Sequence, residues 1–177
     1  PEPFEKQAPL SCIQCGIESD RALGVERTGD RFAVEKFREP QRWDVVAYVK
    51  PREIHDQEGP TNFVHRLVGL PGEEIVIRDG AIYANGTKLE IPADLGPLRY
   101  TARPDGFGVM DPLDDIKDLL LGDPKKPVRL SDDEYFFLGD NTQRSNDGRF
   151  HGPVKREAII GVVTLIYWPP ERWKIFK

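Results

Sequence analysis

Apolar and polar residues alternate along several short runs of this chain, with a period of two residues. Such alternation is typical of strands with one face in a core, because successive side chains of a strand point to opposite faces. Turn signals separate the runs: Asp79-Gly80 and Asn85-Gly86 supply residues that tolerate a positive φ and favour hairpins. The strands that this pattern predicts are 31–35, 43–49, 61–68, 74–78, 81–84, 134–138 and 159–168.

The alternation weakens between about residues 86 and 130, where one short helix is predicted. Asp111 suits its N-cap, Pro112 its first position and Gly122 its end. Residues 1–28 show no period and are expected to form an irregular N-terminal segment. The chain is therefore predicted to be mostly β: a coiled sheet or barrel domain over 29–177, with a small inserted subdomain at approximately 86–130 and one or two short helices.

The length and charge of the chain indicate one domain and argue against a nucleic-acid partner. The 177 residues suffice for one domain with a sizeable core, and the formal charge of −5 comes from residues scattered along the chain. A nucleic-acid partner is therefore not expected. The longest apolar run, Ala158 to Trp168, is too short for a membrane span, so we expect any membrane anchor to lie upstream of Pro1.

The two cysteines form a CxxCG motif, Cys12 to Gly16, which has the shape of half a zinc ribbon. A four-ligand zinc site needs a second pair, and the chain contains no further cysteine. Three interpretations stay open: a disulfide loop, a two-thiolate metal site at Cys12 and Cys15 completed by another ligand, or a relic of a lost site.

One strand run carries two polar side chains in its middle, His65 and Arg66. With a period of two, Phe63, His65 and Leu67 share one face of the strand, whereas Arg66 points to the other. From this stretch alone, the plainer interpretation is a half-buried histidine held by a neighbour, beside a surface arginine.

A second polar group follows the apolar strand 134–138, in the stretch GDNTQRSNDGRFHG from Gly139 to Gly152. It is either an Asx-rich loop that hydrogen-bonds its own backbone or a functional loop. Loops with convergent charges directly after a buried strand are where sites are usually built.

These stretches together resemble the type I signal peptidases, membrane-anchored serine proteases that remove signal peptides on the outer face of the membrane. The resemblance runs from Gly29 to Trp168 and is poorest in the insertion. Its motifs, in order, are Gly29-Asp30-Arg31, Trp43-Asp44-Val45-Val46, the RLVGLPGE run from Arg66, the Asp-Gly and Asn-Gly hairpin, and the stretch from Gly139. The resemblance implies the family's largely β catalytic domain.

The resemblance also gives His65 a role. It stands where bacterial members place the lysine that activates the serine, and relatives from archaea and the endoplasmic reticulum use histidine. A histidine, with a pKa of about 6.5, needs less tuning than a lysine to accept a proton near neutrality. It needs an orienting partner, for which Asp147 is the candidate, and by the same resemblance Ser145 hydrogen-bonds the base.

The remaining site residues implied by the resemblance hold the loop and the substrate. Arg149 is expected to pair with Asp147, Arg66 with Asp140, and Gly139 to leave room beside the base. The substrate is expected to lie extended along an edge strand beside Phe63 and Val64, held through its backbone. One departure from the family motif is the glycine between Asp147 and Arg149, where the family has serine.

A second departure is that the family's Ser-Met segment, which carries the nucleophile, is not found in the chain. One interpretation places the serine upstream of Pro1, so that the chain by itself is inactive. The other is a homologue without the serine, which binds secreted or membrane-tethered segments without cutting them. A third, self-cleaving repressor-type interpretation is disfavoured by His65 and by the loop from Gly139. The serine mechanism requires no cofactor.

Overall fold

The computed structural model describes residues 10–11, 18–19, 29–51, 60–100, 121–142 and 145–176. Its strands are β1 (Leu10–Ser11), β2 (Glu18–Ser19), β3 (Arg31–Glu35), β4 (Val45–Pro51), β5 (Pro60–Gly69), β6 (Glu74–Arg78), β7 (Ala81–Ala84), β8 (Thr87–Lys88), β9 (Val128–Arg129), β10 (Glu134–Leu138), β11 (Val154–Lys155), β12 (Ile159–Trp168) and β13 (Lys174–Ile175). The helical elements are α1 (Gly148–His151) and three 3₁₀ turns, at Ala93–Leu95, Arg156–Ala158 and Pro170–Arg172. The prediction of a mostly β chain is confirmed.

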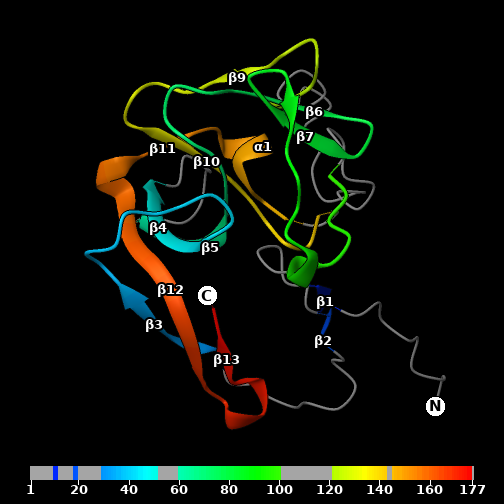
Figure 1. Cartoon of the computed structure of the whole chain (residues 1–177). Helices are drawn as coiled ribbons and strands as arrows, with labels where there is room; N and C mark the ends of the chain where they lie inside the picture. Colours follow the sequence, from blue (N-terminus) through cyan, green and yellow to red (C-terminus); the bar gives the residue numbers. More distant parts are fainter. Residues whose placement is uncertain are drawn as a thin grey trace, which may run out of the picture.

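Two antiparallel sheets make up the domain (Figure 1). The larger has the order β11-β10-β5-β4-β12-β13, and β3 also pairs with β12. The smaller has the order β8-β7-β6-β9. β1 and β2 pair with each other within the segment that we expected to be irregular. β5 and β10 lie side by side in the larger sheet, so the strand of His65 adjoins the strand that leads into Gly139.

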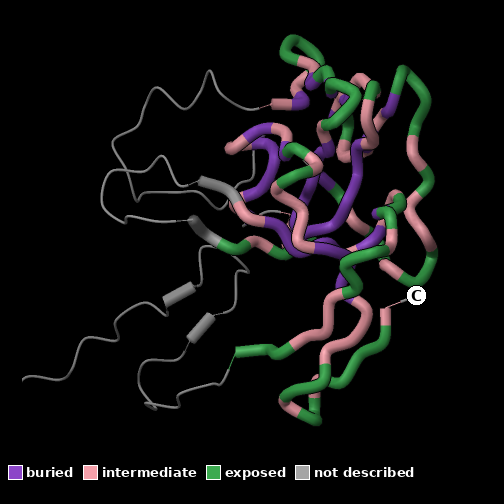
Figure 2. The backbone as a smooth tube through the Cα atoms, turned by 90° about the vertical axis from the view of Figure 1, so that its left-hand side faces the viewer, coloured by how far each residue is buried: buried purple, intermediate pink, exposed green. Residues whose placement is uncertain are grey.

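β10 joins the two parts of the core because both of its faces are buried. Phe136 and Leu138 pack into one cluster with Ile75 and Ile77 of the smaller sheet. Tyr135 and Phe137 pack into the other cluster, among residues of the larger sheet. Figure 2 shows the buried residues gathered in this part, whereas β3, β13 and the last residues of β12 are intermediate or exposed.

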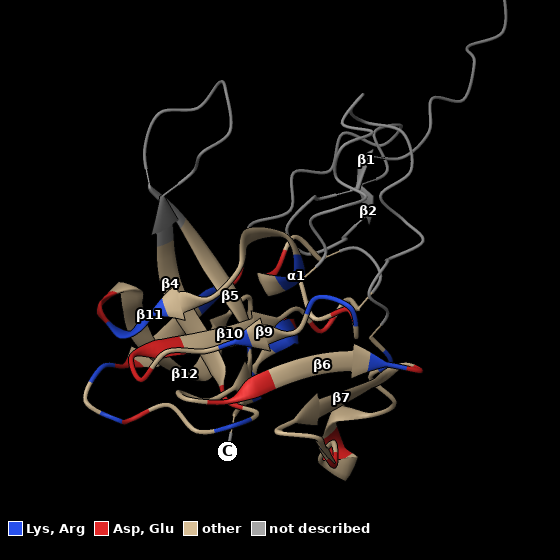
Figure 3. Ribbon diagram, turned by 90° about the horizontal axis from the view of Figure 1, so that it is seen from above, with Lys and Arg blue, Asp and Glu red and all other residues tan. Residues whose placement is uncertain are grey.

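The alternating pattern located most strands well, but strand 43–49 was predicted to begin too early. Trp43 has a φ of 75°, which lies outside the strand region, and β4 begins at Val45. The side chain of Asp44 fixes this turn by accepting hydrogen bonds from the backbone N–H of Gln41 and from Arg38. The charged residues of the domain lie mainly at strand ends and in loops (Figure 3).

The predicted helix between Asp111 and Leu121 lies outside the described part of the chain except for Leu121, which stands in a turn. Within the predicted insertion, Leu89, Leu98 and the fully buried Tyr100 pack on the same cluster as Ile75. This part of the insertion therefore contributes to the domain core. In the described residues, no helix is both long and apolar enough to cross a membrane.

Candidate active site

His65 lies in the middle of β5, on the face that the alternation predicts, and is only 5% exposed. Its Nε2 is 3.3 Å from Oγ of Ser145, and its Nδ1 is 2.8 Å from the hydroxyl of Tyr48 on β4. The ring of Tyr48 is itself stacked between Phe63 and Phe137, at centroid distances of 5.6 and 4.6 Å. These aromatic contacts hold the Tyr48 hydroxyl at the imidazole.

Burial lowers the pKa of His65 below its ordinary value. The charges of Asp147 and Asp140 act in the opposite direction, and that of Arg149 adds to the lowering. Because a buried imidazole is costly to protonate, burial favours the neutral form of His65, which is the form that can accept a proton.

Asp147 is fully buried, and its carboxylate accepts hydrogen bonds from Arg149 and Gly139. Oδ1 accepts from Nε and the backbone N–H of Arg149, at 2.9 and 3.1 Å, and Oδ2 accepts from Nη2 of Arg149 and the backbone N–H of Gly139, at 2.8 and 2.9 Å. The contact that we expected between Asp147 and His65, directly or through Ser145, is not among the hydrogen bonds of these described side chains. Tyr48 stands in its place, because Asp147 is the N-cap of α1.

Gly139 leaves the space that Ser145 occupies beside the imidazole. A Cβ at Gly139 would collide with Oγ and Cβ of Ser145 and would stand 3.5 Å from Cδ2 of His65. Gly148, where the family motif has serine, is equally enclosed: a Cβ there would lie 2.6 Å from the carbonyl oxygen of Phe137. The missing hydroxyl at position 148 therefore matches a backbone that packs directly on β10.

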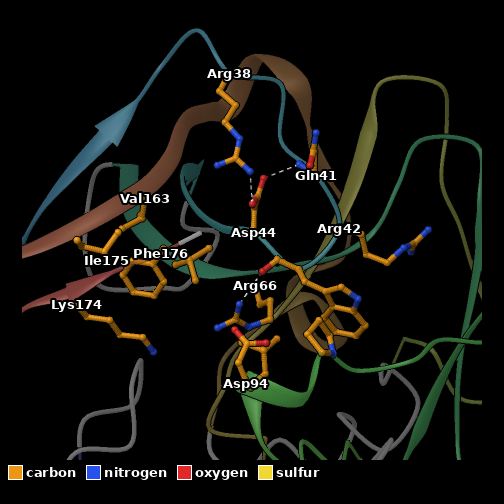
Figure 4. Close-up of a pocket in the computed structure, with 14 residues that line it drawn as sticks. Arg38, Gln41, Arg42, Asp44, Arg66, Asp94, Val163, Lys174, Ile175 and Phe176 are labelled. Carbon is orange, nitrogen blue, oxygen red and sulfur yellow. Dashed lines mark hydrogen bonds and ion pairs between the residues drawn. The ribbon is translucent and has the colours of Figure 1, made fainter.

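Arg66 points to the opposite face of β5 from His65. Its Nε and Nη2 donate to the two carboxylate oxygens of Asp140, at 2.7 and 2.6 Å, and its Nη1 donates to the carbonyl oxygen of Trp43. This bidentate pair ties the loop after β10 to β5, as the resemblance implies. Arg66 also lines a pocket of about 530 Å³ with Arg38, Asp44 and the segment 174–176 (Figure 4). Neither His65 nor Ser145 lines this pocket, so it is not the candidate active site.

Among the described strands, none pairs with one edge of β5 next to the site. β4 pairs with β5 from Pro60 to Arg66, whereas β10 pairs only with its end, from Arg66 to Gly69. Leu67 exchanges backbone hydrogen bonds with the chain before β4, so by alternation the N–H and C=O of Val64 point to the opposite, open edge. Val64 is 40% exposed as a residue, whereas the ring of Phe63 stacks on that of Tyr48.

Sequence reasoning missed two residues of the site. Tyr48 shares a face of β4 with Val46, and nothing in the local pattern distinguishes it from a core tyrosine. His151 ends α1, and its Nε2 is 3.2 Å from the hydroxyl of Tyr48. Its place in the polar stretch after Gly139 was the available signal. Cys12 and Cys15 lie outside the described residues, and the part that is described holds no cluster of metal-binding side chains.

The chain is similar to a known family and to known proteins. The family model described as signal peptidase, peptidase S26, matches residues 19–168. A probable signal peptidase I-2 of Synechocystis sp. is 30% identical over 152 residues, which cover 81% of this chain and 57% of that protein. A signal peptidase I of Leptolyngbya laminosa is 31% identical over 163 residues, which cover 88% and 68%.

The chain thus spans somewhat more than half of the first of these relatives. The crystal structure of a signal peptidase I from Enterococcus faecalis superposes with a TM-score of 0.49 and 30% identity, covering 72% of this chain and 98% of that one. The matched residues 19–168 include the strand of His65 and the whole loop from Gly139 to Gly152. The chain belongs to the signal peptidase family, peptidase S26.

Proposed function

We propose that this chain is the catalytic β domain of a signal peptidase I-type serine endopeptidase, which removes signal peptides from secreted preproteins. One observation carries the proposal: His65, at the family's base position, is buried with its Nε2 turned to Ser145 in the loop after β10. Membership of the family supports the same activity.

In this mechanism Nε2 of His65 takes the proton of a serine hydroxyl as the serine attacks the scissile carbonyl carbon. His65 then gives that proton to the leaving amine. Ser145 is 1% exposed and hydrogen-bonded to the base, so we assign it to holding the imidazole until the attacking hydroxyl takes its place at Nε2. The resemblance places the nucleophile before the strand of Gly29, outside the described residues.

The surrounding charges fix the loop that carries Ser145. Asp147 and Arg149 form an ion pair with 0% exposure of either side chain, and Arg66 holds Asp140 on the other side of β5. Gly139, which has no Cβ, leaves the space that Ser145 fills beside His65. Together these contacts support a preorganised base that requires no cofactor. Zinc at Cys12 and Cys15 stays a separate hypothesis.

The precursor would bind in extended form at the open edge of β5. There the N–H and C=O of Val64 are available for backbone hydrogen bonds, in the manner of an added strand. Such pairing is independent of sequence, so selectivity would come from small pockets for alanine-like residues before the cleavage point. The partners that follow from this function are secreted preproteins and the membrane, which would be reached through an anchor outside this chain. The catalytic domain would lie on the extracytoplasmic face of the membrane.

The experiment uses the full-length protein that the gene encodes, in detergent micelles, with two model precursors. One has alanine before the expected cleavage point, and the other has a bulky residue there. Cleavage of the alanine precursor alone, at that bond, would support the proposal. Tight binding of both precursors without cleavage would replace it with the non-cutting homologue.

A further inference from the structure

Three side chains from separate elements are joined end to end behind the imidazole of His65. Nδ1 of His65 on β5 is 2.8 Å from the hydroxyl of Tyr48 on β4, and the same hydroxyl is 3.2 Å from Nε2 of His151 on α1. Nδ1 of His151 is 3.1 Å from the carbonyl oxygen of Gly152. The chain of contacts therefore runs from Ser145 through His65 and Tyr48 to the backbone at Gly152.

The direction of each hydrogen bond follows from the far end of this chain. The carbonyl oxygen of Gly152 can only accept, so Nδ1 of His151 carries a hydrogen. When His151 is neutral, its Nε2 then carries no hydrogen and accepts the single hydrogen of the Tyr48 hydroxyl. The Tyr48 oxygen is left to accept, and only a hydrogen on Nδ1 of His65 can fill that bond.

This order of donors leaves Nε2 of His65 without a hydrogen. The lone pair of Nε2 points to Oγ of Ser145, which donates to it. Burial, and then the charge of Asp147, raises the pKa of Tyr48, so that its hydroxyl keeps its hydrogen throughout the physiological range. The charged groups near His65, namely Asp147, Asp140 and Arg149, make no hydrogen bond to its ring among the described contacts and do not compete for Nδ1.

We propose that Tyr48 and His151 are positioning residues that hold His65 in the tautomer with its hydrogen on Nδ1, and so keep Nε2 without a hydrogen and able to act as the base. This inference rests on the proposed function in taking His65 as the base. Tyr48 and His151 would do by a relay what a carboxylate does in serine proteases, where the wrong tautomer of the histidine abolishes most of the activity.

Nitrogen NMR of the imidazoles tests the tautomer without any need for activity. The chain has three histidines, so the His65 signals are identified by their loss in His65→Gln. At a pH above its titration, His65 should show a protonated Nδ1 and an unprotonated Nε2. The opposite assignment in the unmodified chain would overturn the proposal.

Two substitutions then break the relay at different points. Tyr48→Phe removes the acceptor of Nδ1, so the hydrogen should move to Nε2, where Ser145 can accept it. His151→Ala frees the Tyr48 hydrogen to turn to Nδ1, with the same result. His151→Gln is the matched control, because its amide oxygen can accept from Tyr48 near the place of Nε2 and should keep the original tautomer.

If the tautomer of His65 is unchanged in Tyr48→Phe, the whole relay is overturned. If it is unchanged in His151→Ala, the proposed role of His151 is overturned. In the full-length protein, Tyr48→Phe and His151→Ala should lower kcat by about 10²-fold or more with little change in KM. His151→Gln should keep most of the kcat of the unmodified protein. If the tautomers behave as expected but the unmodified full-length protein cleaves no precursor, the proposed function fails and the relay stands.

Discussion

Asp147 and Arg149 form a bidentate ion pair in which neither side chain reaches solvent. The pair lies within the loop that carries Ser145, and the same carboxylate also holds the backbone N–H of Gly139. Asp147 therefore stabilises the conformation of the loop, whereas Tyr48 is the residue that contacts Nδ1 of His65.

Removing the charge of Arg149 alone should destabilise the domain strongly. Arg149→Met leaves the carboxylate of Asp147 buried without its cation, which typically costs about 3–5 kcal/mol of the free energy of unfolding. Adding Asp147→Asn should recover part of that loss, because the buried charge is then gone. Urea unfolding of the chain measures both.

Arg129 provides the matched control for this prediction. It pairs with Glu74 at 2.8 Å, but its side chain is 81% exposed, so Arg129→Met should change the free energy of unfolding by less than about 1 kcal/mol. Equal effects at positions 149 and 129 would show that the buried pair has no special part in the fold.

The space at Gly139 should tolerate no methyl group while Ser145 is present. Gly139→Ala drives a Cβ into Oγ and Cβ of Ser145, and such overpacking costs about 1–3 kcal/mol. Ser145→Gly removes both clashing atoms and should restore most of the stability in the double variant. Thermal melts measure the stability of these variants. In them Gly29→Ala, where a Cβ meets nothing within 4 Å, should be close to neutral. A double variant no more stable than Gly139→Ala would contradict the packing described for the loop.

The buried His65 should make the folded state sensitive to acid. Its folded pKa lies below the value of about 6.5 that it has when unfolded, so just under pH 6.5 the unfolded chain binds more protons. The contribution of His65 to stability is complete above that pH and is lost as the pH falls through the window below it. The free energy of unfolding should therefore drop less steeply on acidification in His65→Gln. Parallel curves for the two proteins would contradict the depressed pKa.

The open edge of β5 can be probed through one backbone group. Val64→Pro removes the N–H that points away from β4 and should leave the β4–β5 pairing in place. The loss of one substrate hydrogen bond, worth about 0.5–1.5 kcal/mol, predicts a 2- to 12-fold weaker binding of precursor to the full-length protein. Val64→Ala keeps the N–H and should bind more nearly as before. Equal binding by Val64→Pro would place the precursor elsewhere.

Strand periodicity predicted most of the long strands, because half-buried strands such as β6 and β7 show their alternation directly in the sequence. It could not find β8, β9, β11 or β13, since two residues are too few to display a period. It also placed Trp43 in a strand, because an apolar side chain gives no sign of a positive φ. The four residues of α1 were read as loop because their N-cap, Asp147, also fits an Asx turn.

The site divides in the same way. His65, Ser145 and the two arginine–aspartate pairs were accessible through a family resemblance, because motifs keep their order along the chain. Tyr48 and His151 were not accessible, since 103 residues separate them and the contact exists only once β4 and α1 have packed. Likewise, the competition between Arg149 and His65 for Asp147 is decided by local helix capping, which spacing alone does not show.

Substitution of His65 in the full-length protein tests whether this residue is the general base. Cleavage of the alanine precursor should fall by about 10²- to 10⁴-fold in His65→Ala, with binding of the precursor retained. The exposed Arg129→Met should cleave at the original rate. Cleavage by His65→Ala at an undiminished rate would contradict the account and leave His65 as a packing residue of β5.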